Sequence, residues 1–387
     1  MTILLVTGAI PHDTASTGAS VVMAGQLAAM AARHQVTLVT FPPASAGEQT
    51  ALATWRASGV AVHASSERIP PSVVGAKRRL QRAVNQLRAP KPRLEPTTGD
   101  TSTQAVIDRL LARDRFDIIH AENVGVGSFR YPDSIPKVLT EHEVGRFGGD
   151  GAETWRVRQP MIWAGFDRVQ VFTPQDAARL RSAAPALADR VRVNPFGIDL
   201  PVRSEVDRED SSAVVFVGSF NHAPNVDAAS WLVEEILPPA IARHSGISLW
   251  LVGEDPPARI ARLAGAVIHV TGRVPDVTPF LQKAAVVVAP VRTGGGMRRK
   301  VLQALALGKP VVTTPLGTEG LVGPREDLPL VVADTADEFS RQLSRLLASP
   351  NQRLELGSRA RAYVAAHHSW SAYADRLDAI YAELGVR

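Results

Sequence analysis

Residues 268–321 read IHVTGRVPDVTPFLQKAAVVVAPVRTGGGMRRKVLQALALGKPVVTTPLGTEGL, and this stretch decides the fold of the chain. Short apolar runs bounded by glycine or proline alternate in it with segments of helical periodicity. The pattern predicts a strand, a short helix, a strand, a glycine loop, a helix and a strand, in that order: 268–270, 277–283, 285–290, 294–296, 297–307 and 311–314. Such alternation is typical of a parallel sheet whose strands are connected through helices.

The glycine loop at 294–296 leads directly into the predicted helix 297–307. Backbone N–H groups and a helix N-terminus then lie at the carboxyl edge of the sheet, which favours binding of an anion such as a phosphate. Arg298, Arg299 and Lys300 would occupy the first helical turn, where a cation costs about 0.3–1 kcal/mol of helix stability. A bound polyanion would make these cations stabilising instead. The alternative is an ordinary crossover, in which the glycines only shape a turn and the cations are solvated.

The same alternation extends over the rest of the chain. In the first half, strands are predicted at 3–6, 35–41, 60–63, 117–121, 137–140 and 168–172, and helices at 18–33, 48–58, 103–113 and 174–183. In the second half, strands at 214–218 and 248–253 and a helix at 226–243 precede the stretch quoted above. A final helix between Trp370 and Leu384 carries an apolar face at helical spacing. These patterns predict an α/β protein with doubly wound parallel sheets.

Length and composition narrow the class of protein. A chain of 387 residues is expected to form about two domains, and 45% hydrophobic with 21% charged residues is typical of a globular protein. The absence of cysteine excludes disulfides, thiolate metal sites and a cysteine nucleophile. The first apolar run stops at Thr7, as a buried strand does, and no run approaches the ~18 residues of a membrane span. A cytoplasmic protein is therefore expected.

The net charge of +5 is concentrated in one segment. Residues 66–93 hold eight lysines and arginines and one acidic residue, Glu67. Such a segment can make peripheral contact with the anionic inner face of a membrane or hold an acidic acceptor, and the alternative is a solvated surface helix. Nucleic acid is not expected as a partner, because no aromatic side chains interleave with these charges.

The stretch 268–321 resembles the donor-binding half of GT-B glycosyltransferases, in the retaining group 1 (family 4-like) enzymes with a glycine triplet. The matching pieces are Gly272, Arg273, Val274, 287–290, 294–296, Arg298, Lys300, Ala304, 308–312 and Gly317. The resemblance implies two Rossmann-like, doubly wound domains that face each other across a cleft. It implies an N-terminal acceptor-binding domain at 1–200, a nucleotide-sugar-binding domain at 201–368, and a C-terminal helix at 369–387 that packs back on the first domain.

The activity implied by this resemblance is retaining transfer of a sugar from a nucleoside-diphosphate (NDP) sugar to an acceptor hydroxyl, on a cell-surface glycan or a natural product. Such a reaction needs positive charge or N–H donors at the diphosphate leaving group. Because no Asp-X-Asp pair occurs in the sequence, no metal or other cofactor is expected. Arg298, Lys300 and the backbone of 295–297 are the candidates to stabilise the leaving group instead.

The resemblance also suggests the remaining site residues. His142 follows a predicted strand and matches a family histidine that contacts the transferred sugar, and its neighbour Glu143 is a candidate to orient the acceptor. The expected contacts to the donor or its nucleotide are Thr17, Gly18, Gly218, Asn221, Arg273, Val274, Gly294, Gly295, Gly296, Met297 and Gln303.

Gly295 and Gln303 depart from the family pattern, because many relatives carry glutamates at both positions. The glycine is shared with the glycine-triplet subgroup. At Gln303, an amide with one acceptor oxygen replaces a carboxylate that usually accepts from both ribose hydroxyls. Weaker ribose binding, a different nucleotide or a lapsed activity would each fit. Two alternatives to a transferase therefore stay open, a nucleotide-sugar-binding protein and an isomerase on the same scaffold.

Overall fold

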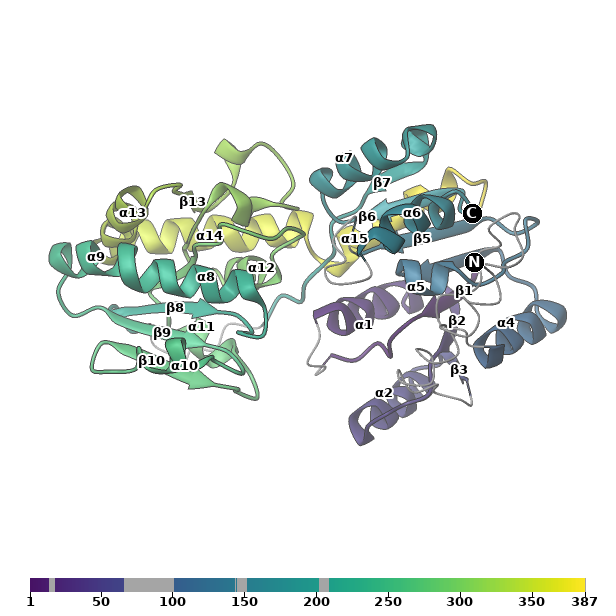
Figure 1. Cartoon of the computed structure of the whole chain (residues 1–387), viewed down its shortest axis with the longest axis horizontal. Helices are drawn as coiled ribbons and strands as arrows, with labels where there is room; N and C mark the ends of the chain where they lie inside the picture. Colours follow the sequence, from purple (N-terminus) through teal and green to yellow (C-terminus); the bar gives the residue numbers. More distant parts are fainter. Residues whose placement is uncertain (14–17, 66–100, 143, 145–151, 202–208, 387) are drawn as a thin grey trace. The chain divides into compact units, whose positions relative to one another are not determined.

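The structure is a computed structural model that describes residues 1–13, 18–65, 101–142, 144, 152–201 and 209–386 (Figure 1). The chain divides into two compact units. Unit 1 comprises residues 1–196 and 373–387, and unit 2 comprises residues 197–372. Each unit is built on its own parallel sheet, as the alternation of apolar runs and helical segments predicts.

Unit 1 contains a seven-stranded sheet with the order β3-β2-β1-β4-β5-β6-β7, and every paired strand is parallel to its neighbour. The strands are β1 (Thr2–Thr7), β2 (Gln35–Thr40), β3 (Ala61–Ala64), β4 (Ile118–Glu122), β5 (Lys137–Glu141), β6 (Arg168–Val171) and β7 (Val191–Val193). The strand order reverses between β1 and β4, which are neighbours. In open sheets of this kind, ligands bind beyond the carboxyl ends of the strands at such a reversal.

The two faces of this sheet differ because successive side chains of a strand point to opposite sides. One face carries residues such as Leu4, Ile119 and Leu139, which form an apolar core with helices α4 to α7. The opposite face mixes buried apolar residues such as Ile3 and Leu5 with polar ones such as His120. It is contacted by α1 and α15, where Gln26 Nε2 donates to the Tyr373 hydroxyl at 2.8 Å. The helices are α1 (Gly18–Ala31), α2 (Ala46–Ala57), α4 (Thr101–Arg113), α5 (Val124–Gly127), α6 (Ala152–Trp163), α7 (Pro174–Ala183) and α15 (Trp370–Ala382).

Unit 2 contains a six-stranded parallel sheet with the order β10-β9-β8-β11-β12-β13. The strands are β8 (Ala213–Val217), β9 (Ser248–Val252), β10 (Ile268–Gly272), β11 (Val286–Ala289), β12 (Val311–Thr313) and β13 (Val331–Val332). Here the order reverses between β8 and β11. The loop that begins at Gly218 follows β8, and the loop that contains the glycines 294–296 follows β11.

Helices pack on both sides of this second sheet (Figure 1). The helices α8, α9 and α13 share an apolar core with one face of the strands. The helices of unit 2 are α8 (Ala223–Trp231), α9 (Leu237–Arg243), α10 (Ala258–Ala261), α11 (Thr278–Lys283), α12 (Arg299–Ala306), α13 (Ala336–Ala348) and α14 (Pro350–His367). The predicted fold class, two doubly wound α/β domains with parallel sheets, is confirmed.

Two helix boundaries differ from the prediction. The single helix expected at 226–243 is divided into α8 and α9 by a π-helical turn at Leu232–Ile236. The turn lies just before Pro238, which has no N–H group to donate to the preceding turn. The helix expected at 297–307 begins only at Arg299, because Gly294 and Gly296 have φ values of +88° and +83° that turn the chain before it.

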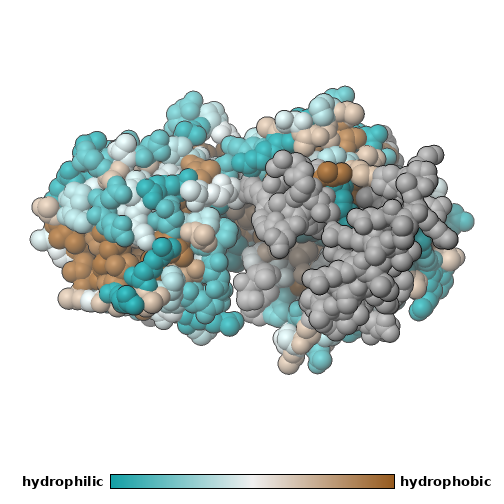
Figure 2. Space-filling view, viewed as in Figure 1, coloured by the Kyte–Doolittle hydropathy of each residue, from teal (hydrophilic) through white to brown (hydrophobic). Residues whose placement is uncertain are grey.

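Some predicted features lie outside the described residues: Thr17, Glu143 and the basic segment 66–93. In the part of the chain that the structure describes, no helix combines the length and apolarity that a bilayer crossing requires. The visible surface of unit 2 is mixed, with hydrophilic residues around one more hydrophobic area (Figure 2).

Candidate functional site

Two loops meet at the carboxyl ends of β8 and β11, where the strand order of unit 2 reverses. The first runs from Gly218 into α8, and the second is the glycine loop that leads into α12. An ideal Cβ placed on Gly294 would lie 3.2 Å from Cγ of Pro224 in α8, so the glycine loop packs closely against the start of α8. The carboxyl edge of the sheet, where the sequence predicts an anion site, is thus formed by two adjacent glycine-containing loops.

Lys300, in the first turn of α12, buries its ammonium group between these loops. Its Nζ donates to Oδ1 of Asn225 at 2.6 Å and lies 4.5 Å from the ring centre of Phe216. Burial, and to a lesser extent the positive charge of Arg298, lowers the pKa of Lys300 from its usual 10.5 to about 7. The group is therefore a poorly solvated cation, and an anion placed beside it would favour its charged form.

Arg298 is the N-cap residue of α12 and points back to the glycine loop. Its NH1 group donates to the carbonyl of Gly295 at 3.0 Å, and the ideal Cβ position of Gly294 lies 3.7 Å from the same nitrogen. Arg298 therefore belongs to the loop rather than to the first helical turn, which corrects its predicted position. A guanidinium group bound to the loop backbone places positive charge next to the ammonium group of Lys300.

A side chain at position 218 would displace the lysine or Asn225, because the backbone there lies against both. An added Cβ would stand 2.8 Å from Nζ of Lys300 and 2.8 Å from Cγ of Asn225. Asn225 in turn donates from Nδ2 to the carbonyl of Ser219 at 2.7 Å. One amide side chain thus connects the loop after β8 to the lysine of α12, and holds the ammonium group beside the backbone of Gly218.

The other predicted residues of unit 2 lie around this centre. Asn221 donates from Nδ2 to Oδ2 of Asp255 at 2.7 Å, at the end of β9. Arg273 follows β10, is 74% exposed, and places Nε 3.9 Å from Oε2 of Glu254. Gln303 lies on α12, one turn beyond Lys300, and is half-buried. Val274 and Met297 are half-buried as well.

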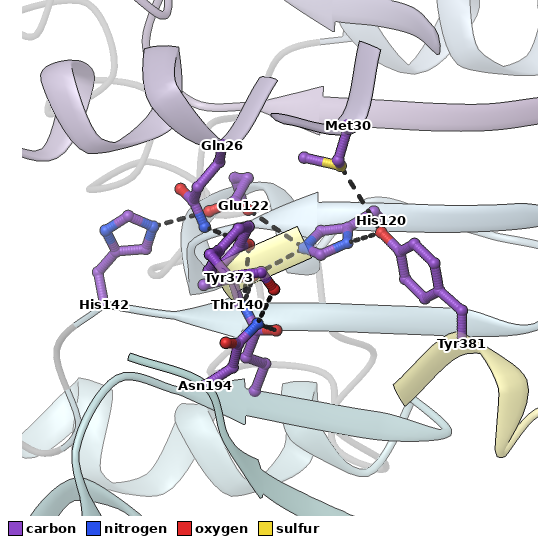
Figure 3. A network of polar contacts seen from close by, with 10 residues as sticks. Gln26, Met30, His120, Glu122, Thr140, His142, Asn194, Tyr373 and Tyr381 are labelled. Atoms are coloured by element: carbon purple, nitrogen blue, oxygen red, sulfur yellow. Dashed lines mark hydrogen bonds and ion pairs between the residues drawn. The ribbon is translucent and has the colours of Figure 1, made fainter. Parts of the chain in front are cut away.

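In unit 1, His142 and Glu122 form a buried pair at the carboxyl ends of β5 and β4 (Figure 3). Nε2 of His142 lies 2.8 Å from Oε2 of Glu122, and the side chains are 8% and 1% exposed. The ring of Phe172 contacts the His142 ring edge-on, with centres 5.0 Å apart. Gly18 is also in unit 1, as the first residue of α1.

A second imidazole lies on the other side of Glu122 (Figure 3). Nε2 of His120 is 3.1 Å from Oε1 of Glu122 and 2.7 Å from Oγ1 of Thr140, while Nδ1 is 2.5 Å from the Tyr381 hydroxyl. Burial would raise the pKa of Glu122, but hydrogen bonds and charges from His120 and His142 outweigh it and lower the pKa to about 2.

The structure therefore brings only some of the predicted residues together. The residues that share the centre in unit 2 are Gly218, Gly294, Gly295, Gly296, Arg298 and Lys300. Three partners were not predicted from the sequence, namely Asn225, Phe216 and Glu122. A signal for Glu122 exists, because residues two apart on a strand share a face, so Glu122 lies beside His120 at the end of an apolar strand.

Two family models match the sequence, one in each half. The model described as Glycosyltransferase Family 4 matches residues 16–201, and the model described as Glycosyl transferases group 1 matches residues 211–349. No curated protein matches the chain significantly in sequence.

Solved structures resemble the chain over nearly its whole length. Sucrose-phosphate synthase from Thermosynechococcus elongatus has a TM-score of 0.67 at 20% identity, covering 99% of both chains. HepE of Anabaena in complex with UDP and glucose has a TM-score of 0.66 at 14% identity, covering 98% of this chain and 99% of the other. TarM of S. aureus, as a variant in complex with UDP, has a TM-score of 0.68 at 10% identity, covering 98% and 99%. Identities this low establish similarity of fold, here the GT-B fold.

Proposed function

Because the chain is a group 1 glycosyltransferase with the GT-B fold, we propose that it transfers a sugar from an NDP-sugar to an acceptor hydroxyl, with retention at the anomeric carbon and without a metal ion. In that reaction the bond between C1 of the sugar and the diphosphate oxygen breaks, a bond from C1 to the acceptor oxygen forms, and the acceptor hydroxyl loses its proton. The charge to be stabilised is the negative charge that develops on the departing diphosphate.

The observation that carries the proposal is the pair of cations at the glycine loop. Lys300 is half-buried, and the contacts of its ammonium group among the described residues are a neutral amide and an aromatic ring rather than a carboxylate. A diphosphate placed against Gly218 and the glycine loop would neutralise it and meet Arg298 at the same time. Because both cations are already held by Asn225 and Gly295, little reorganisation is needed when charge develops.

UDP is the first nucleotide to test. The structures of HepE and TarM that resemble this chain contain UDP, which supports a uridine nucleotide without fixing the base or the sugar. We propose that Arg273 and Val274 lie beside the base, Gln303 beside the ribose, and His142 beside the transferred sugar. The acceptor is proposed only as a hydroxyl compound.

UDP at 100 times its Kd is expected to stabilise the protein against unfolding by about 2.7 kcal/mol. UDP, GDP and dTDP should be compared by thermal denaturation, with UMP as the control that lacks a diphosphate. At equal concentration UMP should shift the melting temperature less than UDP, since it cannot span Arg298 and Lys300. The absence of a shift with every nucleoside diphosphate would refute the donor site.

Transfer activity is expected to persist in excess EDTA, because the cations of the chain replace a metal on the diphosphate. Release of UDP from a UDP-sugar is measured after dialysis against EDTA and again after addition of Mg²⁺ or Mn²⁺. Complete loss of activity in EDTA, followed by recovery with either ion, would show that a metal is required.

One observation favours a second candidate, a nucleotide-sugar-binding protein with weakened transferase activity. Gln303 offers one acceptor oxygen where relatives offer a carboxylate to the ribose. The two candidates differ in turnover. A protein that shows the UDP-dependent thermal shift but releases no UDP from UDP-sugars, with water or added hydroxyl acceptors, would be a binding protein.

A further inference from the structure

The environment of Glu122 determines which ring nitrogen of His142 carries the proton. The carboxylate is buried, and two imidazoles approach it from two elements, His120 from β4 itself and His142 from the end of β5. Tyr373 and Tyr381 are the ionisable groups that reach this region from α15, and burial raises the pKa of both hydroxyls, so they stay protonated. Two charged side chains of α15 also act on these hydroxyls, Asp378 on Tyr381 and Arg376 on Tyr373.

An ionised carboxylate can only accept hydrogen bonds. Because the pKa of Glu122 is lowered to about 2, the group is ionised throughout the physiological range. The ring nitrogen that lies 2.8 Å from Oε2 must therefore donate, which puts a proton on Nε2 of His142. Nδ1 is then the ring nitrogen left for a ligand, as an acceptor when the imidazole is neutral.

His120 also lies beside the ionised carboxylate. The Tyr381 hydroxyl contacts Nδ1 of His120 and donates to Sδ of Met30, so the proton on Nε2 of a neutral His120 is favoured by Oε1 of Glu122, 3.1 Å away, rather than by the tyrosine. That N–H group faces Thr140 Oγ1 and Oε1 of Glu122. Nε2 of His142 thus hydrogen-bonds to Oε2 of the carboxylate, whereas Nε2 of His120 hydrogen-bonds to Thr140 and only approaches Oε1, at 3.1 Å.

We propose that Glu122 is a positioning residue for His142, which fixes the imidazole in the tautomer with a proton on Nε2 and presents Nδ1 to the donor sugar. The contact with the sugar rests on the function proposed above, whereas the tautomer does not. Glu122 itself touches no substrate. Its effect on the reaction passes through the orientation and protonation of the histidine. Carboxylates that orient metal-binding histidines in other proteins act in the same way.

The test is the Glu122→Gln variant, read by ¹⁵N NMR of the imidazole rings. The amide keeps the shape of the carboxylate but can donate as well as accept, so it no longer fixes the tautomer. The resonances of His142 are assigned from their loss in His142→Asn. In the wild-type protein at pH 8 we expect the Nε2–H form of His142 alone, and in Glu122→Gln a mixture or the opposite tautomer.

Glu141→Gln is a matched control, because Glu141 is equally buried at the end of the neighbouring strand β5 but points to the other face of the sheet, where it accepts from Nε1 of Trp163 at 2.9 Å. It should leave the His142 tautomer unchanged. For Glu122→Gln, kcat/KM is expected to fall by about 10–100-fold, in line with the loss of other histidine-orienting partners.

The outcomes separate the two proposals. A wild-type His142 with its proton on Nδ1 overturns the positioning role without any variant, so a Glu122→Gln protein that fails to fold does not block the test. An unchanged tautomer in a folded Glu122→Gln protein overturns it as well. A changed tautomer with unchanged activity supports the positioning role and instead removes His142 from the proposed sugar contact.

Discussion

Replacing Lys300 by methionine is expected to lower kcat/KM by about 30- to 1,000-fold, because it removes a charge-assisted contact worth about 2–4 kcal/mol to the departing diphosphate. Methionine retains an unbranched apolar stem and removes a buried charge from unit 2. Burying a charge that no anion neutralises costs free energy, so the melting temperature without nucleotide should stay equal or rise. Initial rates of UDP release and a thermal melt measure the two effects.

Arg298→Ala is expected to lower kcat/KM over the same range of about 30- to 1,000-fold, since it removes the second cation and the bond that holds the loop at Gly295. Lys283→Met serves as the control, because Lys283 is an exposed lysine on α11 of the same unit and should leave kcat/KM within about threefold of wild type. If both Lys300→Met and Arg298→Ala also stay within about threefold, these cations do not face the diphosphate.

The sequence predicts the architecture well because local patterns encode it. Apolar runs that end in glycine, such as Val214 to Gly218, mark strands that are buried on both faces and then turn. The predicted strands of both sheets are present, each within a few residues of its observed bounds. Boundaries that depend on single backbone angles were less accurate. The start of α12 at Arg299 follows from the positive φ of Gly294 and Gly296, which composition alone does not reveal.

Partners of the site residues were harder to predict, because they come from distant parts of the chain. Asn225 holds Lys300 across 75 residues of sequence, and the contact follows only once β8 and β11 are known to be neighbours. Glu122 and His142 meet for a similar reason, since the β4–β5 register pairs Glu122 with Thr140. Sequence patterns place a residue at a strand end, whereas sheet order and register decide what it contacts.

The affinity for UDP is expected to fall by about tenfold per pH unit between about pH 7.5 and 9. Burial and the charge of Arg298 lower the pKa of Lys300 to about 7, so in this window the nucleotide-free protein holds the lysine mainly uncharged. A diphosphate favours the charged ammonium and raises its pKa, so binding must take up a proton. Below about pH 7 the lysine is already charged and this dependence disappears. The terminal phosphate of UDP ionises near pH ~6 and adds no slope in the window.

Titration calorimetry at several pH values, in buffers of different ionisation enthalpy, measures both the Kd and the proton uptake, which should approach one proton per nucleotide near the top of the window. The groups in direct contact with Lys300 are Asn225 and Phe216, which do not titrate, and the nearby Arg298 stays charged, so the slope belongs to the lysine. Lys300→Met should therefore bind UDP more weakly but with a Kd that no longer varies with pH. A wild-type Kd that is constant from about pH 7.5 to 9, or an equal slope in the variant, would mean that this ammonium group does not bind the diphosphate.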